Sequence, residues 1–264
     1  MDYQKLFIDK IDGIAYITMN YSKNLNAIDV RMSKELIAAL EDCENDNNVK
    51  VVVVRANGKA FSAGGDLLYS YEKLQSEGRV DFDELINLVG KLALKMKKMK
   101  KIIITAVDGA AAGAGASIAI AGDIVIMSDK SSLIQAFCNV GLVPDTGATY
   151  MLANTIGTAR AMKMILTGKP VKADEAYALG LATEVCSSGE INIVTDKWAK
   201  RIVNGPLIAY ENVKRQFFEA VYHDFERYLL EGEKPTQQAV SHTEDFKEGV
   251  KAFVEKRPAI FQGK

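Results

Sequence analysis

The chain has 264 residues, of which 48% are hydrophobic and 25% are charged, so a core of ordinary domain size can form. The net charge of −1 does not favour nucleic acid or an anionic membrane as a partner, and the longest apolar runs fall well short of a membrane span. Its cysteines, Cys43, Cys138 and Cys186, form neither a metal-binding spacing nor an evident disulfide framework. Together with an opening, Met1–Gln4, that lacks a signal-peptide pattern, they predict a cytoplasmic protein.

Strand and helix patterns alternate along the first part of the chain. Apolar and β-branched runs predict strands, and apolar residues at helical spacing predict helices. In chain order we expect a strand at 14–19, a helix at 31–44, a strand at 51–54, a helix at 82–100, and strands at 102–107 and 123–127. This alternation is typical of an α/β fold with crossover connections.

The strand signal fades after about residue 187. Periodic apolar residues predict helices at 194–203, 207–228 and 244–255. No linker rich in Gly, Ser or Pro precedes them, so we expect this helical segment to pack on the α/β core or on a neighbouring subunit.

Two turns rich in small residues follow predicted strands, at Phe61–Leu67 and Val107–Ala116. Small side chains let a ligand approach the backbone, and the first N–H groups of a helix have no partner within it. N–H groups from both turns could therefore converge on one oxygen as an oxyanion hole. For either turn taken alone, close packing of a helix on a sheet is the favoured interpretation. Neither turn has the spacing of a nucleotide-phosphate loop.

Asp145 lies between apolar residues in the segment Val140–Ala148, in a chain with two histidines, His223 and His242, both far downstream. Desolvation raises the pKa of a carboxylate in such a setting and makes it a better base. Asp after Pro and before Thr-Gly is also ordinary turn and helix-cap chemistry. Asp145 is thus the first residue to consider for proton transfer.

Taken together, these segments resemble the crotonase superfamily, the enoyl-CoA hydratase/isomerase family. The resemblance covers nearly the whole chain. It rests on Asn24–Ala27, Phe61–Leu67, Ala106–Asp123, Gly141–Gly147, Leu166–Gly168, Ala176–Val185 and Arg257–Phe261. It implies a spiral of ββα units over 1–200 and a C-terminal helical trimerisation region over 201–264. It also implies acyl thioester substrates whose oxygen is held by the N–H groups of Ala63 and Ala114, with no metal or other cofactor.

The catalytic positions depart from the hydratases of this family. Those enzymes carry two glutamates, at the positions that Ser117 and Phe137 occupy here. Hydration divides its proton transfers between two carboxylates, so a hydratase of the usual type is rejected. The resemblance is closest to double-bond isomerases of enoyl thioesters, including bacterial ones that act on decenoyl-acyl-carrier protein, in which one Asp, here Asp145, shuttles a proton. We expect Phe137, Ser117, Asp66 and Leu67 at the substrate pocket, with Asp66 orienting the loop and Ser117 packing on its helix.

The resemblance also suggests how the CoA or carrier-protein end of the substrate is bound. The residues at the matching positions are Lys23, Asn26, Ala27, Ala60, Phe61 and Lys256. Lys23 and Lys256, with Arg257, could meet CoA phosphates or the acidic face of a carrier protein, although exposed cations are usually only solvated. A homotrimer or a dimer of trimers is the implied assembly.

Other functions remain as alternatives. They are a ring-opening isomerase of the phenylacetyl-CoA-epoxide type, an enoyl-CoA hydratase, and an inactive homologue that binds RNA or protein. The basic run Lys95–Lys101 would serve RNA binding, but it ends an amphipathic helix, where cations suit the helix dipole, and it has no interleaved aromatic residues. An aryl-CoA dehalogenase would carry Trp at Phe137, and the only Trp is Trp198.

Overall fold

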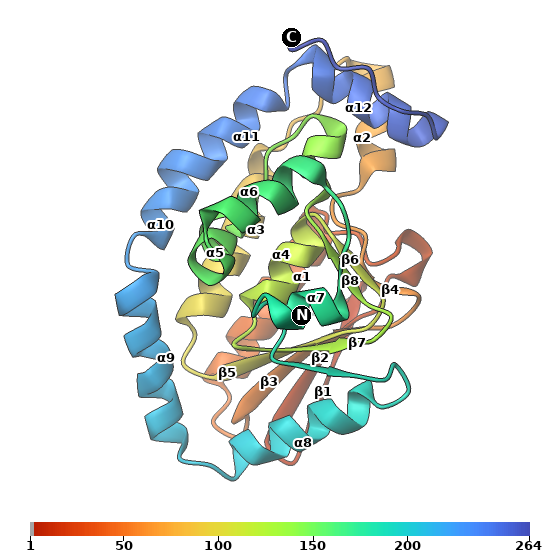
Figure 1. Cartoon of the computed structure of the whole chain (residues 1–264). Helices are drawn as coiled ribbons and strands as arrows, with labels where there is room; N and C mark the ends of the chain where they lie inside the picture. The colour runs from red at the N-terminus through yellow and green to blue at the C-terminus, as the bar shows by residue number, and fades with distance from the viewer. Residues whose placement is uncertain (1–2) are drawn as a thin grey trace.

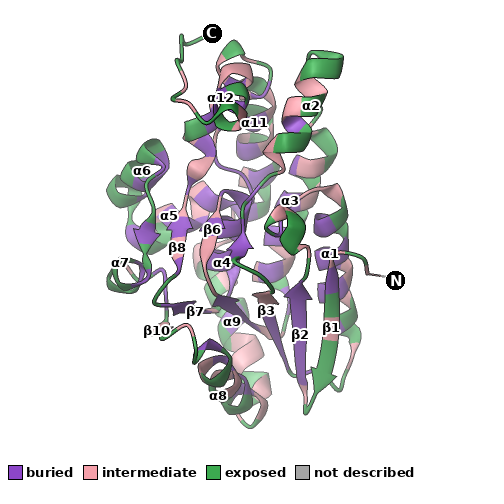
Figure 2. Cartoon of the chain, turned by 90° about the vertical axis from the view of Figure 1, so that its right-hand side faces the viewer, coloured by how far each residue is buried: buried purple, intermediate pink, exposed green. Residues whose placement is uncertain are grey.

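A computed structural model describes residues 3–264; Met1 and Asp2, at the opening that lacks a signal-peptide pattern, lie outside the described residues. The larger of two sheets has the order β1-β2-β3-β5-β7-β10. Its strands are β1 (Leu6–Ile11), β2 (Ile14–Met19), β3 (Val51–Ala56), β5 (Ile102–Val107), β7 (Ile124–Ser128) and β10 (Glu184–Cys186). All neighbours pair in parallel except β1 and β2. The edge strand β1 is largely exposed, whereas β2 and β3 are buried (Figure 2).

A second sheet of short strands has the order β4-β6-β8-β9. Its strands are β4 (Ala60–Ser62), β6 (Ala110–Ala112), β8 (Ser132–Ile134) and β9 (Val171–Lys172). Because β4, β6 and β8 follow β3, β5 and β7, the chain repeats a unit of long strand, short strand and helix. The α/β spiral of ββα units is therefore confirmed. The two small-residue turns do not pass directly from a long strand into a helix, as the sequence suggested, because each first adds a strand to this second sheet.

Helices cover both faces of the larger sheet (Figure 1). They are α1 (Val30–Asn45), α2 (Leu67–Glu77), α3 (Asp83–Lys98), α4 (Ala114–Ala121), α5 (Ala148–Ile156), α6 (Thr158–Thr167), α7 (Ala173–Ala178), α8 (Ile191–Val203), α9 (Leu207–Val221), α10 (Phe225–Arg227), α11 (Lys234–Val240) and α12 (Glu244–Glu255), with short 3₁₀ turns η1 (Ser22–Asn24) and η2 (Ala136–Val140) and a π-helical turn η3 (Tyr228–Glu233). On one face α1, α3 and the wholly buried α4 form the main core. On the other face α8 packs through Ile191, Ala199 and Ile202. No helix within residues 3–264 combines the length and the apolarity needed to cross a membrane.

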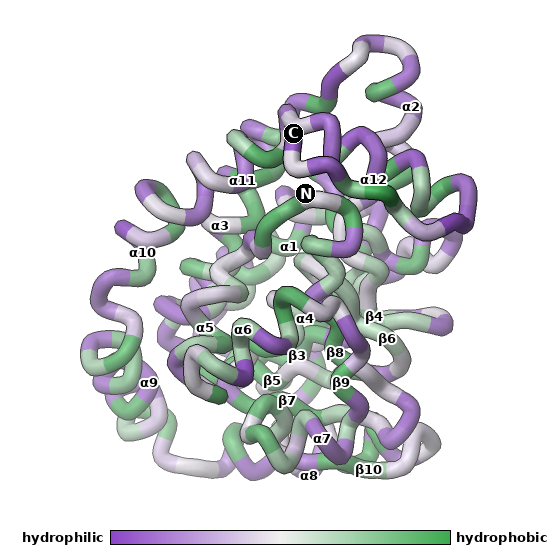
Figure 3. Tube along the Cα trace, turned by 45° about the horizontal axis from the view of Figure 1, so that its top comes forward, coloured by the Kyte–Doolittle hydropathy of each residue, from purple (hydrophilic) through white to green (hydrophobic). Residues whose placement is uncertain are grey.

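The C-terminal helices pack on the core of their own chain. α12, along which hydrophobic and hydrophilic residues alternate (Figure 3), lies on α2 and η2. A Cβ on Gly249 would come within 2.5 Å of the Val140 backbone, so the two elements are in close contact. The expected continuous helix over 207–228 was wrong, because α9 ends at Val221. The helix is interrupted where Tyr222 and Phe225 pack around Tyr150, with distances between ring centroids of 5.9 and 5.1 Å.

Candidate active site

Three parallel strands of the second sheet end at one edge, where the site is built. Ser62 of β4 pairs with Ala111 of β6, and Ala112 pairs with Ile134 of β8. The residues that follow these strands therefore lie side by side, as the carboxyl ends of parallel strands do. In this way the fold brings together Ala63, Ala114 and Phe137, which the sequence separates by up to 74 positions (137 − 63).

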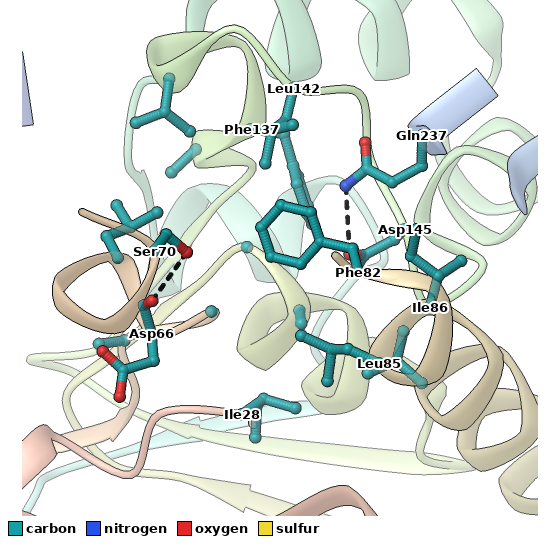
Figure 4. Close-up of a pocket in the computed structure, with 18 residues that line it drawn as sticks. Ile28, Asp66, Ser70, Phe82, Leu85, Ile86, Phe137, Leu142, Asp145 and Gln237 are labelled. Atoms are coloured by element: carbon teal, nitrogen blue, oxygen red, sulfur yellow. Dashed lines mark hydrogen bonds between the residues drawn. The ribbon is translucent and has the colours of Figure 1, made fainter. Parts of the chain in front are cut away.

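An apolar cavity opens at this edge (Figure 4). Its walls come from Ile28, from the start and first turns of α3, and from η2 and the loop after it. The apolar lining includes Phe82, Leu85, Ile86, Val89, Phe137, Val140 and Leu142. The polar side chains in the lining are Asp66, Ser70, Asp145 and Gln237. The cavity volume is about 80 Å³.

The two small-residue turns are packed against each other at the cavity. A Cβ on Gly64 would lie 2.7 Å from the Ala112 carbonyl oxygen, and one on Gly115 would lie 2.5 Å from the Ser62 Cβ. Glycine is therefore required at both positions for the turns to approach this closely. Both Ala63 and Ala114 line the cavity, which agrees with convergence of the two turns on one ligand.

The two expected N–H donors differ in their present hydrogen bonds. Ala114 is the first residue of α4, so its N–H has no partner within the helix. The Ala63 N–H donates to the Leu25 carbonyl oxygen at 2.9 Å. Leu25 and Asn26 have left-handed backbone conformations, with φ of 47° and 53°. A ligand oxygen that takes the Ala63 N–H must therefore share it with Leu25 or replace that bond.

Asp145 also lines the cavity, and it is 9% exposed. One carboxylate oxygen accepts a hydrogen bond from the Thr146 hydroxyl at 2.8 Å, and the other accepts from the Gln237 amide at 3.4 Å. Burial raises the pKa of Asp145 to about 6, although both hydrogen bonds act to lower it. A carboxylate with this pKa is ionised at neutral pH and remains basic enough to accept a proton from carbon.

The turn that carries Asp145 has an unusual backbone. Thr146 and Gly147 both adopt left-handed conformations, with φ of 58° and 74°. This region is costly for a β-branched residue such as Thr146. At Gly147 a Cβ would come within 2.3 Å of the Phe225 ring, so only glycine fits. The C-terminal segment thus packs directly against the turn.

The expected pocket residues divide into two groups. Phe137, Asp66 and Leu67 line the cavity, and Phe137 is 7% exposed. Ser117 is fully buried behind the lining, and its hydroxyl lies 3.3 Å from the Asp145 backbone carbonyl rather than from the carboxylate. Asp66 caps α2 by accepting from the Tyr69 N–H at 3.0 Å and also accepts from the Asn24 amide at 2.6 Å. These contacts agree with a loop-orienting role for Asp66.

The residues expected to bind the carrier end of the substrate lie outside the cavity lining. Ala27, Ala60 and Phe61 are buried, and the Asn26 amide donates to the carbonyls of Asn57 and Ala60. Lys23, on η1, and Lys256, directly after α12, are both exposed. Arg257 makes paired hydrogen bonds to Glu248 at 2.6 and 2.8 Å and is therefore already engaged.

The basic run at the end of α3 is largely paired with carboxylates. Lys95 forms an ion pair with Glu44, Lys98 with Glu226, and Lys100 with Glu211. The Lys101 ammonium donates to the backbone carbonyls of Cys43 and Asp46. This arrangement favours a solvated helix face over a nucleic-acid contact.

Comparison with known proteins agrees with this geometry. A family model described as enoyl-CoA hydratase/isomerase matches residues 9–264. The chain belongs to this family. It is 33% identical to a trans-2-decenoyl-acyl-carrier-protein isomerase of Streptococcus mutans, with full coverage of both chains. It is 30% identical to a 1,2-epoxyphenylacetyl-CoA isomerase of Escherichia coli, with 96% of each chain covered.

The fold is also that of solved structures in the family. An enoyl-CoA hydratase from Mycobacterium avium subsp. paratuberculosis superposes with a TM-score of 0.90 at 30% identity, over 99% of this chain and all of the other. Family membership and fold are thus established, while the names of the relatives cover hydration as well as two kinds of isomerisation.

Sequence reasoning missed two polar side chains of the cavity lining, Ser70 on α2 and Gln237. Gln237 reaches the cavity from α11, in a stretch for which the sequence predicted no element. A Gln inside a polar helical sequence normally indicates an exposed face, so no local signal distinguished it.

Proposed function

We propose that this protein is an isomerase that moves the double bond of an enoyl thioester, with Asp145 as its acid–base residue. The main supporting observation is that one buried carboxylate, Asp145, lines the same cavity as the apolar side chain of Phe137. The other carboxylate in the lining, Asp66, is held as the cap of α2. One base suffices for isomerisation, because the proton that it removes returns to the same molecule.

The reaction follows from the two walls of the cavity. The thioester oxygen accepts hydrogen bonds from the Ala114 N–H and from the Ala63 N–H, which exchanges the Leu25 carbonyl for the substrate. Asp145 removes a proton from the allylic carbon, and the C–H electrons form a dienolate whose charge lies on the held oxygen. Asp145 then returns the proton to the other end of the dienolate. The double bond moves by one position, and no water or electron acceptor is consumed.

The cavity disfavours hydration for a physical reason. Water addition needs a held water molecule and a second proton-transfer group, and Phe137 fills the position where the resembling hydratases carry a glutamate. An apolar wall excludes water and raises the basicity of Asp145.

The cavity volume bears on how a substrate enters. A volume of about 80 Å³ is small beside the ~300–1,000 Å³ typical of ligand pockets. A medium-length acyl chain would therefore have to displace side chains of the apolar lining. The carrier is CoA or acyl-carrier protein, and we expect a cytoplasmic homotrimer or dimer of trimers that acts in fatty acid metabolism.

Ring-opening isomerisation is the second candidate. The relative that is named a 1,2-epoxyphenylacetyl-CoA isomerase supports it, since its 30% identity extends over 96% of this chain. A single base in the same cavity as an oxyanion site serves that reaction class as well. A ring and a linear acyl chain would occupy the same small cavity, so activity on one kind of substrate but not the other distinguishes the two candidate functions.

The test is an assay of cis-3 and trans-2 enoyl substrates on CoA and on acyl-carrier protein, with double-bond position and hydroxyacyl product measured by NMR. We expect isomerisation, and we expect Asp145→Asn to lower kcat by about 10³-fold or more while substrate binding persists. Asp174→Asn, at an exposed position on α7, is the matched control. Full activity in Asp145→Asn, or hydration as the main reaction, would refute the proposal.

A further inference from the structure

The helical segment from η3 to α11 buries polar residues where an exposed face would be usual. Leu229, Glu233, Gln237 and Ser241 follow one another at intervals of four and are all buried. Lys, Glu and Gln are rarely buried unless they are paired. The partners of Glu233 and Gln237 all lie in one place, the turn that carries Asp145.

Glu233 binds the backbone of that turn. Its two carboxylate oxygens accept from the Gly147 N–H at 3.0 and 2.9 Å, and the Thr146 N–H also points to them. Successive N–H groups in left-handed residues form a concave anion site. Gly147 also precedes the first residue of α5, so the carboxylate lies at a helix N-terminus. Glu233 therefore holds the strained part of the turn in place.

Gln237 binds the other side of the same turn. Its amide oxygen accepts from the Val143 N–H at 3.2 Å, and its amide nitrogen donates to the Asp145 carboxylate at 3.4 Å (Figure 4). The two side chains thus attach at Val143 and at Gly147, on either side of Asp145.

From this geometry we infer that Glu233 and Gln237 are positioning residues that hold the Asp145 turn and couple the charge of Asp145 to that of Glu233. The inference rests on the proposed function, in which Asp145 is the base. Neither residue was among the functional candidates that the sequence provided. Gln237 fixes the orientation of the carboxylate, and Glu233 fixes the backbone on which the carboxylate stands.

The charges near the pair favour such coupling. Asp145 is the ionisable group whose charge raises the pKa of Glu233. Glu233 in turn raises the pKa of Tyr228, which lies one turn earlier. Among residues 3–264, no Lys, Arg or His side chain acts on the pKa of either carboxylate. Burial, and then the charge of Asp145, raise the pKa of Glu233 to about 8, against about 6 for Asp145. The charge of Asp145 therefore opposes ionisation of Glu233, as expected for two carboxylates that hold the same turn.

The first experiment measures kcat and KM for isomerisation in Glu233→Gln and Gln237→Leu, with Glu231→Gln as the matched control. Glu231 lies on the same helical segment and is exposed. We expect kcat to fall by about ten- to a hundredfold in both variants, with KM within about threefold of the wild-type value, because a misplaced base slows chemistry more than binding. Wild-type kcat in both variants would overturn the inference.

The second experiment measures the coupling without relying on activity. Carbon-13 NMR of labelled Asp and Glu carboxyl groups follows the titration of Glu233, assigned with Glu233→Gln, in the wild type and in Asp145→Asn. Removing the neighbouring charge should lower the pKa of Glu233 by about one unit or more. An unchanged Glu233 titration in folded Asp145→Asn would overturn the inference, whatever the kcat of the Glu233 and Gln237 variants. A wild-type enzyme that shifts no double bond would refute the proposed function instead, and the titration would still test the coupling.

Discussion

The two walls of the cavity are built in different ways. The wall with Ala63 and Ala114 consists of backbone at the ends of paired strands, packed so closely that glycines are required at Gly64 and Gly115. The wall with Asp145 is a loop whose polar supports, Glu233 and Gln237, come from 86 to 94 residues further along the chain. The first wall is specified by small residues in two short segments, 62–64 and 112–115, that meet through strand pairing, and the second by single side chains from a distant helical segment.

Because of this difference, catalysis should depend on steric fit at the first wall and on electrostatics at the second. On the backbone wall an added methyl group displaces a strand end and with it an oxyanion donor. On the Asp145 wall, access of water to the carboxylate or a change of neighbouring charge alters the basicity of Asp145. Substitutions on the two walls should therefore differ in whether they change the rate alone or also the pH dependence.

Apart from the loss of the base itself in Asp145→Asn, the largest effect is expected from Gly64→Ala on the backbone wall. The added Cβ would lie 2.7 Å from the Ala112 carbonyl oxygen, at a residue with φ of 85°. Separating the two turns should lower kcat by about 10²- to 10³-fold, the effect of losing one oxyanion donor. We also expect the free energy of unfolding to fall by about 1–3 kcal/mol, measured by urea denaturation.

Gly78→Ala is the control for backbone strain alone. Its φ of 71° is equally left-handed, but no atom lies within 4 Å of the added Cβ. It should lose some stability and keep its kcat. If Gly64→Ala kept its kcat as well, the close contact between the turns would have no role in catalysis.

A smaller effect with a pH signature is expected from Phe137→Ala on the Asp145 wall. The base must be ionised, so kcat/KM should fall on the acid side below a pH near 6, where Asp145 titrates. Opening the apolar wall hydrates the carboxylate and lowers its pKa, so this acid limb should move to lower pH by about one unit. The weaker base should lower kcat by about tenfold. Phe253→Ala, which is 56% exposed on α12, is the control.

An acid limb at the same pH in Phe137→Ala would contradict desolvation as the cause of the raised Asp145 pKa. A limb that moved to higher pH would contradict it more strongly. Measuring the hydroxyacyl product in the same variant also tests whether Phe137 is what excludes water from the reaction.

The sequence predicted long regular elements well and short ones poorly. The strands at 14–19 and 102–107 and the helix at 244–255 have the expected bounds, because strong apolar periodicity determines them. The strands Ala60–Ser62 and Ala110–Ala112 were not predicted, since alanine has no β preference and their pairing depends on distant partners. The segment 148–167, which forms α5 and α6, also received no prediction.

The same distinction applies to the site. Ala63, Ala114, Phe137 and Asp145 lie together as the resemblance implied, since each occupies a recognisable local motif. Glu233 and Gln237 occupy no recognisable local motif. Their partners, the N–H groups of Gly147 and Val143, become visible only in the folded chain. Ser117 was placed at the pocket from its motif position, and it lies one layer behind, against the backbone of Asp145.

The smallest effect is expected outside both walls, from Lys23→Glu and Lys256→Glu. Both residues are exposed, and contacts between exposed charges contribute little and are screened by salt. If they meet CoA phosphates or an acidic carrier protein, charge reversal should raise KM by about two- to tenfold at low salt and leave kcat unchanged. Lys130→Glu, at an exposed lysine before β8 and so at the opposite end of that strand from the site, is the control. A KM effect with only one of the two carriers would identify the natural one. Equal KM values for all three variants on both carriers would show that substrate recognition, like catalysis, lies within the cavity walls.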